Sequence, residues 1–542
     1  MCLRENNVRK NTFVQGALIL TAAGIIVKFI GAISRIYLSR LLGGEGIGLY
    51  QMAYPIYLLC LAVSSAGLPV AISIMVAEKN AIHDYLGGQR VFRISLMALT
   101  ATGLFFSALL YFGAHWLIDS GIVRDPRAYW SLLALSPAIL MATVLATLRG
   151  YFQGLQSMTP TAVSQIIEQL FRVVIMIGLA VVLLPYGLEY GAAGATFGAA
   201  PGAFVGILVL LYFYYRNRGW RKEMLESRDK SIVPDSTWKI IKRLLVLALP
   251  VSLANIMLPI VSNIDLFIVP RRLEVAGFSV ETSTTLFGYL TGMATALVNM
   301  PTIMTASLAA SLVPVISEAV ARGNREIISQ RTGLAMRMAN LITVPSFIGM
   351  CVIATPISSM LYATPDAGPC IAVMSFGVFL LGVQQVTTGV LQGMGKTAIP
   401  FINMVVSACV KIILSWNLTA IPSLGVLGAA WATNADFGVA ALLNLYFLHK
   451  YMNYRLDIAH TVRCFISAGA MGAAVVGTDA AAYPALHSNT PATILAILVG
   501  VVVYGLAVVL THTVRAEDVE SIPKIGKRAA GVIRKLDIFG KR

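Results

Sequence analysis

The residues of this chain that could do chemistry are ionisable side chains set within long apolar segments. They are Lys28, Arg35, Glu168, Arg172, Asp265, Arg337, Lys411 and Asp436. A charged group inside a membrane is costly unless it faces a partner or a water-filled cavity, so such residues mark substrate or ion pathways. Cations form the majority, which favours the binding of an anion over bond-making chemistry. Arg337 lies near the end of its segment and is interpreted as interfacial.

Spacing places several of these cations on defined helix faces. Lys28 and Arg35 are seven residues apart and share one face of a helix that carries no carboxylate. Glu168 stands four residues before Arg172, the favourable order for an ion pair that is either structural or part of a gate or coupling site. We therefore expect a cationic cavity for phosphate or another strong anion. Its expected lining residues are Lys28, Arg35, Arg172 and Lys411.

The remaining acidic residues are candidates for gating or coupling. Asp265 is expected to pair with Arg35 near the outer side of the membrane, across the two halves of the chain, as an outer gate. Arg271 and Arg272 either join this gate or mark the end of their helix. Asp436 is either a cation site or a paired core residue, and the sequence does not choose between these two roles.

The elements that must position these groups are membrane-spanning helices. The chain has 542 residues, of which 57% are hydrophobic and only 12% charged, whereas soluble domains carry roughly 25% charged residues. Fourteen segments are apolar for about the 20 residues that a helix needs to cross a membrane. They are expected at 13–38, 47–77, 92–118, 128–152, 159–184, 190–214, 244–270, 284–312, 332–361, 369–392, 398–421, 425–448, 463–483 and 491–512. The predicted fold class is an all-α polytopic membrane protein, with GGEGIG (43–48) as a turn between the first two spans.

The distribution of Lys and Arg predicts the orientation. If both termini lie in the cytoplasm, the opposite side holds only Arg40, Arg124, Arg127, Arg271 and Arg272. The cytoplasmic segments then hold most of the other Lys and Arg residues, and Arg149 is one of these. This asymmetry is the positive-inside rule, and it predicts a multi-pass protein of the cell membrane. The rule also accounts for the net charge of +16 without a nucleic-acid partner.

An internal repeat divides the chain into two lobes. A shift of 239 residues aligns Gly150 with Gly389 and Arg172 with Lys411, and it places Ser407 at the position of Glu168. Lys411 is therefore expected to be an unpaired cation. Six spans in each repeat predict two six-helix lobes in parallel orientation, as in one class of alternating-access transporter, plus two extra helices. The predicted parts are an N-lobe at 1–214, a basic cytoplasmic linker at 215–243, a C-lobe at 244–448, two further spans at 449–513 and a basic cytoplasmic tail at 514–542. The tail is interpreted either as an amphipathic helix on the anionic inner leaflet or as a solvated basic tail.

Motifs for catalysis and for metal or cofactor binding are not found in the sequence. There is no Walker A, HExxH or CxxC pattern, and the outer loops are too short for a catalytic domain. We expect no enzymatic activity, no cofactor and no metal.

Several segments resemble the stage V sporulation protein B family. They are KNTFVQGALILTAAGIIVKFIGAISRIYLSRLLGGEGIGLYQMAYPIYLL (10–59), GLPVAISIMVAE (67–78), LRGYFQGLQSMTPTAVSQIIEQLFRV (148–173), LPYGLEYGAAGA (184–195) and LVPVISE (312–318). That family of polysaccharide biosynthesis proteins belongs to the multidrug/oligosaccharidyl-lipid/polysaccharide exporter superfamily and is related to the lipid II flippases. In those relatives, arginines of the first helix line a cationic cavity for a lipid diphosphate. Arg35 matches such a position, and Lys28 lies about one residue out of register with a second.

The resemblance implies a flippase for an undecaprenyl-diphosphate-linked saccharide, lipid II above all, used for cell-wall or spore-cortex peptidoglycan. Membrane lipids and peptidoglycan-synthesis enzymes are the expected partners. The protein is expected to be a monomer. Two alternatives remain: a cation-coupled multidrug antiporter of the same superfamily, which needs carboxylates that the first helix lacks, and a membrane scaffold for wall-synthesis enzymes.

Overall fold

The protein is an all-α, multi-span membrane protein, as predicted. The computed structural model describes residues 2–65, 67–217 and 235–514, and within these ranges the regular structure is helical. Twelve helical segments of the described chain are long and apolar enough to cross a membrane. The first of them, Ile19–Ala81, covers two of the predicted spans, and helix α9 coincides with the seventh predicted span.

Packing divides the chain into two compact units. Unit 1 comprises Met1–Arg271 and Val280–Gly288, and unit 2 comprises Arg272–Ser279 and Tyr289–Arg542. The lobe boundaries predicted from the repeat are a different kind of division and stay a prediction. Residues 218–234 of the predicted linker and 515–542 of the predicted tail lie outside the described residues.

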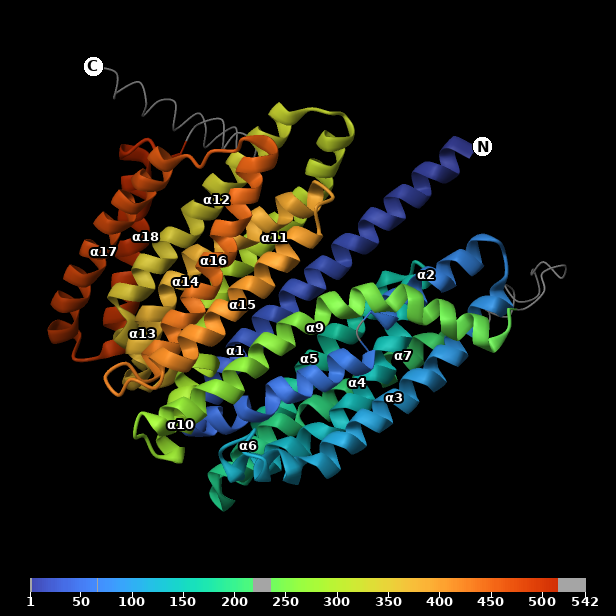
Figure 1. Ribbon diagram of the computed structural model, residues 1–542, viewed down its shortest axis with the longest axis horizontal. Coiled ribbons are helices and arrows are strands. Elements are labelled where there is room, and N and C mark those ends of the chain that lie inside the picture. Colours follow the sequence, from blue (N-terminus) through green and yellow to red (C-terminus); the bar gives the residue numbers. More distant parts are fainter. Residues whose placement is uncertain (1, 66, 218–234, 515–542) are drawn as a thin grey trace. The chain divides into compact units, whose positions relative to one another are not determined.

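Unit 1 is a bundle in which α4 packs against α1, α2, α3, α6 and α7 (Figure 1). Its helices are α1 (Cys2–Ser65), α2 (Leu68–Ala81), α3 (Tyr85–Asp119), η1 (Pro126–Ala128), α4 (Tyr129–Gly154), α5 (Met158–Leu183), η2 (Leu184–Tyr186), α6 (Leu188–Phe197), α7 (Ala199–Arg216), α9 (Thr237–Val275, up to Arg271) and α10 (Val280–Phe287).

Unit 2 is a bundle in which α14 packs against α11, α12 and α16, and α17 pairs with α18 (Figure 1). Its helices are the π-helical η3 (Gly288–Ala294), α11 (Thr295–Ala321), α12 (Arg325–Val352), α13 (Ala354–Tyr362), η4 (Pro365–Ala367), α14 (Gly368–Gly393), α15 (Ala398–Leu418), α16 (Val426–Met452), α17 (Ile458–Leu486) and α18 (Asn489–Leu510).

The turn expected at residues 43–48 is instead a kink at one residue. Only Gly43 leaves the helical conformation, with φ 65° and ψ −172°, and helix α1 continues on both sides of it. A positive φ is readily available to glycine, so one residue can redirect the chain without a loop. The prediction of a turn was therefore wrong in extent, although it located the bend.

The repeat recurs as matching close contacts inside each unit. A Cβ added at Gly150 would lie 2.7 Å from the carbonyl oxygen of Pro69, and one at Gly389 would lie 2.6 Å from that of Ala309. A second matched pair of contacts follows: an added Cβ would meet the side chain of Val76 at Gly154 in unit 1, and that of Ile316 at Gly393 in unit 2. Glycine lets these helix backbones approach closely, as small residues do in membrane bundles.

One close contact is repeated with its two residues exchanged. In unit 1, a Cβ at Gly103 of α3 would lie 2.1 Å from the hydroxyl of Thr143 in α4. In unit 2, the equivalent positions hold Thr343 in α12 and Gly382 in α14, where an added Cβ would lie 2.6 Å from the Thr343 methyl group. Both units therefore pair one glycine with one threonine at the same crossing.

Candidate functional site

The candidate site of unit 1 is a cluster of three charged residues on α4 and α5. Glu168 accepts a hydrogen bond from Arg149 Nη2 at 2.7 Å through Oε2, and its Oε1 bonds Nη2 of Arg172. Arg149 Nε also donates to the hydroxyl of Ser164 at 3.1 Å. The side chains of Arg149, Glu168 and Arg172 are 18%, 13% and 26% exposed. We call Arg149, Glu168 and Arg172 the arginine–glutamate cluster; it carries one positive charge in excess.

Small residues on α7 allow that helix to approach the cluster. A Cβ at Gly202 would lie 2.8 Å from Cβ of Arg172, and one at Gly206 would lie 3.4 Å from Cβ of Glu168. A larger side chain at Gly202 would overlap the backbone of α5. The glycines therefore hold the charged residues of α5 in a close-packed setting.

Aromatic residues of α1 lie beside Arg172. Tyr50 and Tyr54 stack with ring centroids 5.3 Å apart, and Tyr54 and Tyr57 follow at 5.7 Å. All three interact electrostatically with Arg172, and Tyr50 also does so with Arg35. The structure thus brings two predicted cavity cations, Arg35 and Arg172, to one tyrosine of α1.

The equivalent positions in unit 2 form a largely uncharged network. Asn403 donates to Asn444 Oδ1 at 2.8 Å, and the Asn444 amide donates to Thr388 Oγ1 at 3.0 Å. By the repeat shift, Asn403 corresponds to Ser164 and Thr388 to Arg149. The arginine of α4 is therefore replaced by a hydroxyl, and an asparagine of α16 completes the hydrogen bonds.

The acidic group of unit 2 is supplied by α16. Ser407 Oγ donates to Asp436 Oδ1 at 2.5 Å, and Asp436 is 8% exposed. Lys411, one turn beyond Ser407, is 3% exposed and has an interaction partner. The expectation that Lys411 is an unpaired cation was therefore wrong, because burial of a charge in a helix bundle requires compensation.

The other predicted site residues differ in exposure and in their contacts. Lys28 is exposed and Arg35 half-buried on α1, and Asp265 is half-buried on α9 with an interaction of its own. Arg272 Nε donates to the carbonyl oxygen of Trp416 at 2.8 Å, and its guanidinium lies 4.6 Å from the Trp416 ring centroid. Arg271 is exposed, 5.8 Å from the Phe267 ring centroid. The Asp265–Arg35 gate stays a prediction.

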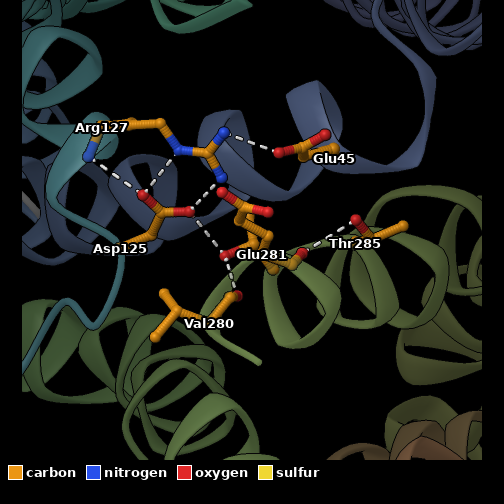
Figure 2. A network of polar contacts seen from close by, with 7 residues as sticks. Glu45, Asp125, Arg127, Val280, Glu281 and Thr285 are labelled. Atoms are coloured by element: carbon orange, nitrogen blue, oxygen red, sulfur yellow. Dashed lines mark hydrogen bonds and ion pairs between the residues drawn. The ribbon is translucent and has the colours of Figure 1, made fainter. Parts of the chain in front are cut away.

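A second charged cluster of unit 1 joins α1, η1 and α10 (Figure 2). Arg127 binds Asp125 side-on, through Nε at 3.0 Å and Nη2 at 2.7 Å, and its Nη1 binds Glu45 at 2.6 Å. Thr284 of α10 donates to the second oxygen of Asp125 at 2.8 Å. Figure 2 shows the side chains of Glu45, Asp125 and Arg127 pointing toward one another. We call Glu45, Asp125, Arg127 and Thr284 the Asp125 clamp.

Sequence reasoning missed Arg149, which we expected among the residues of a cytoplasmic segment. The structure places it inside α4 and in an ion pair with Glu168. No pattern in the sequence pointed to this pair, because Arg149 lies on α4 and Glu168 on α5. The described residues contain no group of three or more His, Cys, Asp or Glu placed to hold a metal ion.

Comparison with known sequences identifies a family. The chain matches a model described as polysaccharide biosynthesis protein over residues 13–320, more than half its length, and a MatE model over residues 250–417. It is 31% identical over 535 residues to stage V sporulation protein B of Bacillus subtilis (strain 168), covering 96% of this chain and 99% of that protein. It is 25% identical over 481 residues to the lipid II flippase MurJ of the same organism, covering 85% and 87%.

Solved structures show the same fold. The lipid II flippase MurJ in an inward closed conformation has a TM-score of 0.68 at 16% identity, over 91% of this chain and 99% of that one. An inward-facing multidrug resistance transporter of the MATE family has a TM-score of 0.64 at 15% identity, over 81% and 98%. The predicted family resemblance is thereby confirmed. The chain belongs to the polysaccharide biosynthesis protein family and is a membrane transporter of the MOP superfamily, not an enzyme.

Proposed function

We propose that this transporter is a flippase for an undecaprenyl-diphosphate-linked saccharide, with the peptidoglycan precursor lipid II as the leading cargo. The observation that carries the proposal is the excess of positive charge in unit 1. Arg149 and Arg172 share the single carboxylate of Glu168, and Arg35 of α1 interacts with the same tyrosine as Arg172. Arginine is well suited to bind a diphosphate because its planar guanidinium can donate two parallel hydrogen bonds.

The similarity to the lipid II flippase MurJ supports the same cargo class, because it covers most of both chains. In the proposed cycle, the diphosphate and sugar enter the polar interior while the lipid tail stays in the membrane, and the lobes alternate access. Both termini are proposed to lie in the cytoplasm, because the expected cytoplasmic segments hold most of the Lys and Arg residues.

The test is complementation in a bacterium depleted of its own lipid II flippases. The wild-type chain should restore lipid II to the outer face of the membrane, whereas Arg35→Ala and Lys411→Ala should fail at normal protein levels. Arg322→Ala is the matched control, because that arginine is 70% exposed and pairs with Glu318. Mass spectrometry of accumulated lipid-linked precursors identifies the saccharide.

Two other outcomes would redirect the assignment. If charge reversal at Lys28, Arg35 and Lys411 left complementation intact, a scaffold for wall-synthesis enzymes would replace the flippase. If the protein lowered sensitivity to cationic drugs and never restored precursor export, a cation-coupled antiporter would replace it, with Asp436 as its candidate carboxylate.

A further inference from the structure

The two arginines of the arginine–glutamate cluster are held unequally. Arg149 is fixed twice, by Glu168 at 2.7 Å and by the hydroxyl of Ser164 at 3.1 Å. Arg172 bonds Glu168 through Nη2 alone, while its buried Nε has no hydrogen-bond partner. A buried donor without a partner destabilises the state that contains it. Arg172 is therefore the incompletely satisfied member of the cluster.

Arg127 in the same unit shows what a complete arrangement looks like. Its Nε and Nη2 atoms both bind the carboxylate of Asp125, at 3.0 and 2.7 Å. This side-on geometry uses one edge of the guanidinium and suits a carboxylate or a phosphate group. Glu168 does not make the same arrangement with Arg172, because it reaches Arg172 only at Nη2 through Oε1, while its Oε2 accepts from Arg149.

We propose that Glu168 is an internal counter-anion for Arg172, and that a diphosphate displaces it by offering both hydrogen bonds that the guanidinium edge can make. The proposal rests on the proposed function and adds a residue that tunes affinity for the cargo's anionic group. The 26% exposure of the Arg172 side chain leaves it reachable.

The exchange strands no charge. When Arg172 turns to the diphosphate, Glu168 keeps its bond to Arg149, which Ser164 holds in place. Breaking a buried pair is costly when one partner is left alone, and this arrangement avoids that cost. Glu168 thus neutralises the charge of Arg172 when no cargo is bound, and it competes with the cargo's diphosphate for Arg172.

The experiment measures binding of inorganic pyrophosphate to the purified full-length protein in detergent. Glu168→Gln removes the competing charge, so it should bind pyrophosphate about tenfold more tightly, the equivalent of roughly one charge-assisted hydrogen bond. The gain should vanish in the double variant Glu168→Gln with Arg172→Ala. Glu318→Gln is the matched control, because Glu318 also pairs with an arginine four residues later, at 2.6 Å, but is 62% exposed.

A second variant guards against loss of folding. Glu168→Asp keeps the charge but is too short to reach both arginines, so it should also release Arg172 and tighten binding. Unchanged or weaker pyrophosphate binding in a folded Glu168→Gln protein overturns the proposal, as does tightening that persists without Arg172. Failure of both single variants to fold also overturns it, since Glu168 is then needed to build the bundle.

The outcomes separate this inference from the proposed function. If the wild type binds pyrophosphate and complements the flippase-depleted strain while Glu168→Gln gains no affinity, only the role of Glu168 is wrong. If the wild type binds no pyrophosphate and exports no lipid-linked precursor, the proposed function itself fails.

Discussion

The hydroxyl of Ser407 donates a 2.5 Å hydrogen bond to Asp436, and both side chains are buried in unit 2. Ser407 takes the repeat position that Glu168 holds in unit 1. The match of GAAGA (191–195) with GVLGA (425–429), a shift of 234 residues, places Asp436 at the position of Gly202. A Cβ at Gly202 would touch the side chain of Arg172. Each unit therefore keeps one carboxylate beside the same turn, but α5 carries it in unit 1 and α16 in unit 2.

Replacing Asp436 should destabilise the protein through Ser407. Asp436→Ala removes the shorter of the two contacts of the Ser407 hydroxyl and leaves it only the Met404 carbonyl oxygen at 3.0 Å, which should cost about 0.5–1.5 kcal/mol. Asp436→Asn retains an acceptor oxygen and should cost less. Thermal unfolding of the purified variants measures the difference. Equal loss in both variants would mean that charge, not the hydrogen bond, is what Asp436 provides.

Arg149→Ala should be among the most damaging single substitutions in unit 1. It removes the bonds to both Glu168 and Ser164 and leaves a buried carboxylate with one partner fewer, at a cost of about 3–5 kcal/mol. Arg322→Ala, at an exposed i,i+4 pair, should change stability by less than about 0.5 kcal/mol. Melting temperatures in the same detergent compare the two, and a mild effect at Arg149 would contradict its structural role.

The exchanged contact predicts a rescue. Gly103→Thr alone should unfold or mislocalise the protein, because its Cβ would lie 2.1 Å from the Thr143 hydroxyl. Adding Thr143→Gly recreates the order found in unit 2 and should restore most of the lost stability. A double-mutant cycle gives the coupling energy, and the absence of coupling would show that the two crossings are not equivalent.

The Asp125 clamp predicts a difference between neighbouring threonines. Thr284→Val removes the bond from α10 to Asp125 and should cost about 1 kcal/mol. Thr285→Val should cost less, because that exposed hydroxyl bonds only the Glu281 carbonyl of its own helix. Protease sensitivity near α10 and thermal unfolding both report the change; the same result for the two variants would argue against a clamp.

The entry to α9 predicts a pH dependence. Hydrogen bonds from Lys239 at 2.8 Å and Lys79 at 2.7 Å lower the pKa of Asp235 to about 2. Because the unfolded value is about 3.9, the stabilising contribution of Asp235 is fully present above about pH 5 and is lost as the pH falls toward 2. The stability difference between the wild type and Asp235→Asn should follow this course. A difference that fades above pH 5 would contradict the assigned pairing.

The sequence predicted the helices well because hydropathy reports directly on lipid exposure. Within the described residues, each of the fourteen apolar segments coincides with one helix or with two consecutive helices, apart from a few residues at helix ends, and the kink at Gly43 lies between the first two segments. The pair of Glu168 and Arg172 followed from spacing alone, since residues four apart on a helix are neighbours.

The sequence could not supply contacts between helices. Arg149 sits on α4, nineteen residues before Glu168, and only the packing of α4 and α5 brings them together. Likewise, the aspartate that faces Ser407 comes from α16, twenty-nine residues later. Such partners depend on helix rotation and close approach, which a single periodic pattern does not specify.

The exchanged pair of glycine and threonine also constrains ancestry. Suppose that the two units descend from one duplicated bundle. Two threonines at this crossing would overlap. A path of single substitutions from the Gly103–Thr143 order to the Thr343–Gly382 order therefore passes through two facing glycines. That intermediate is loosely packed yet tolerable. On this path, one unit passed through a loosely packed helix crossing before a threonine filled the space again. The present order shows which helix supplied that threonine in each unit, α4 in unit 1 and α12 in unit 2.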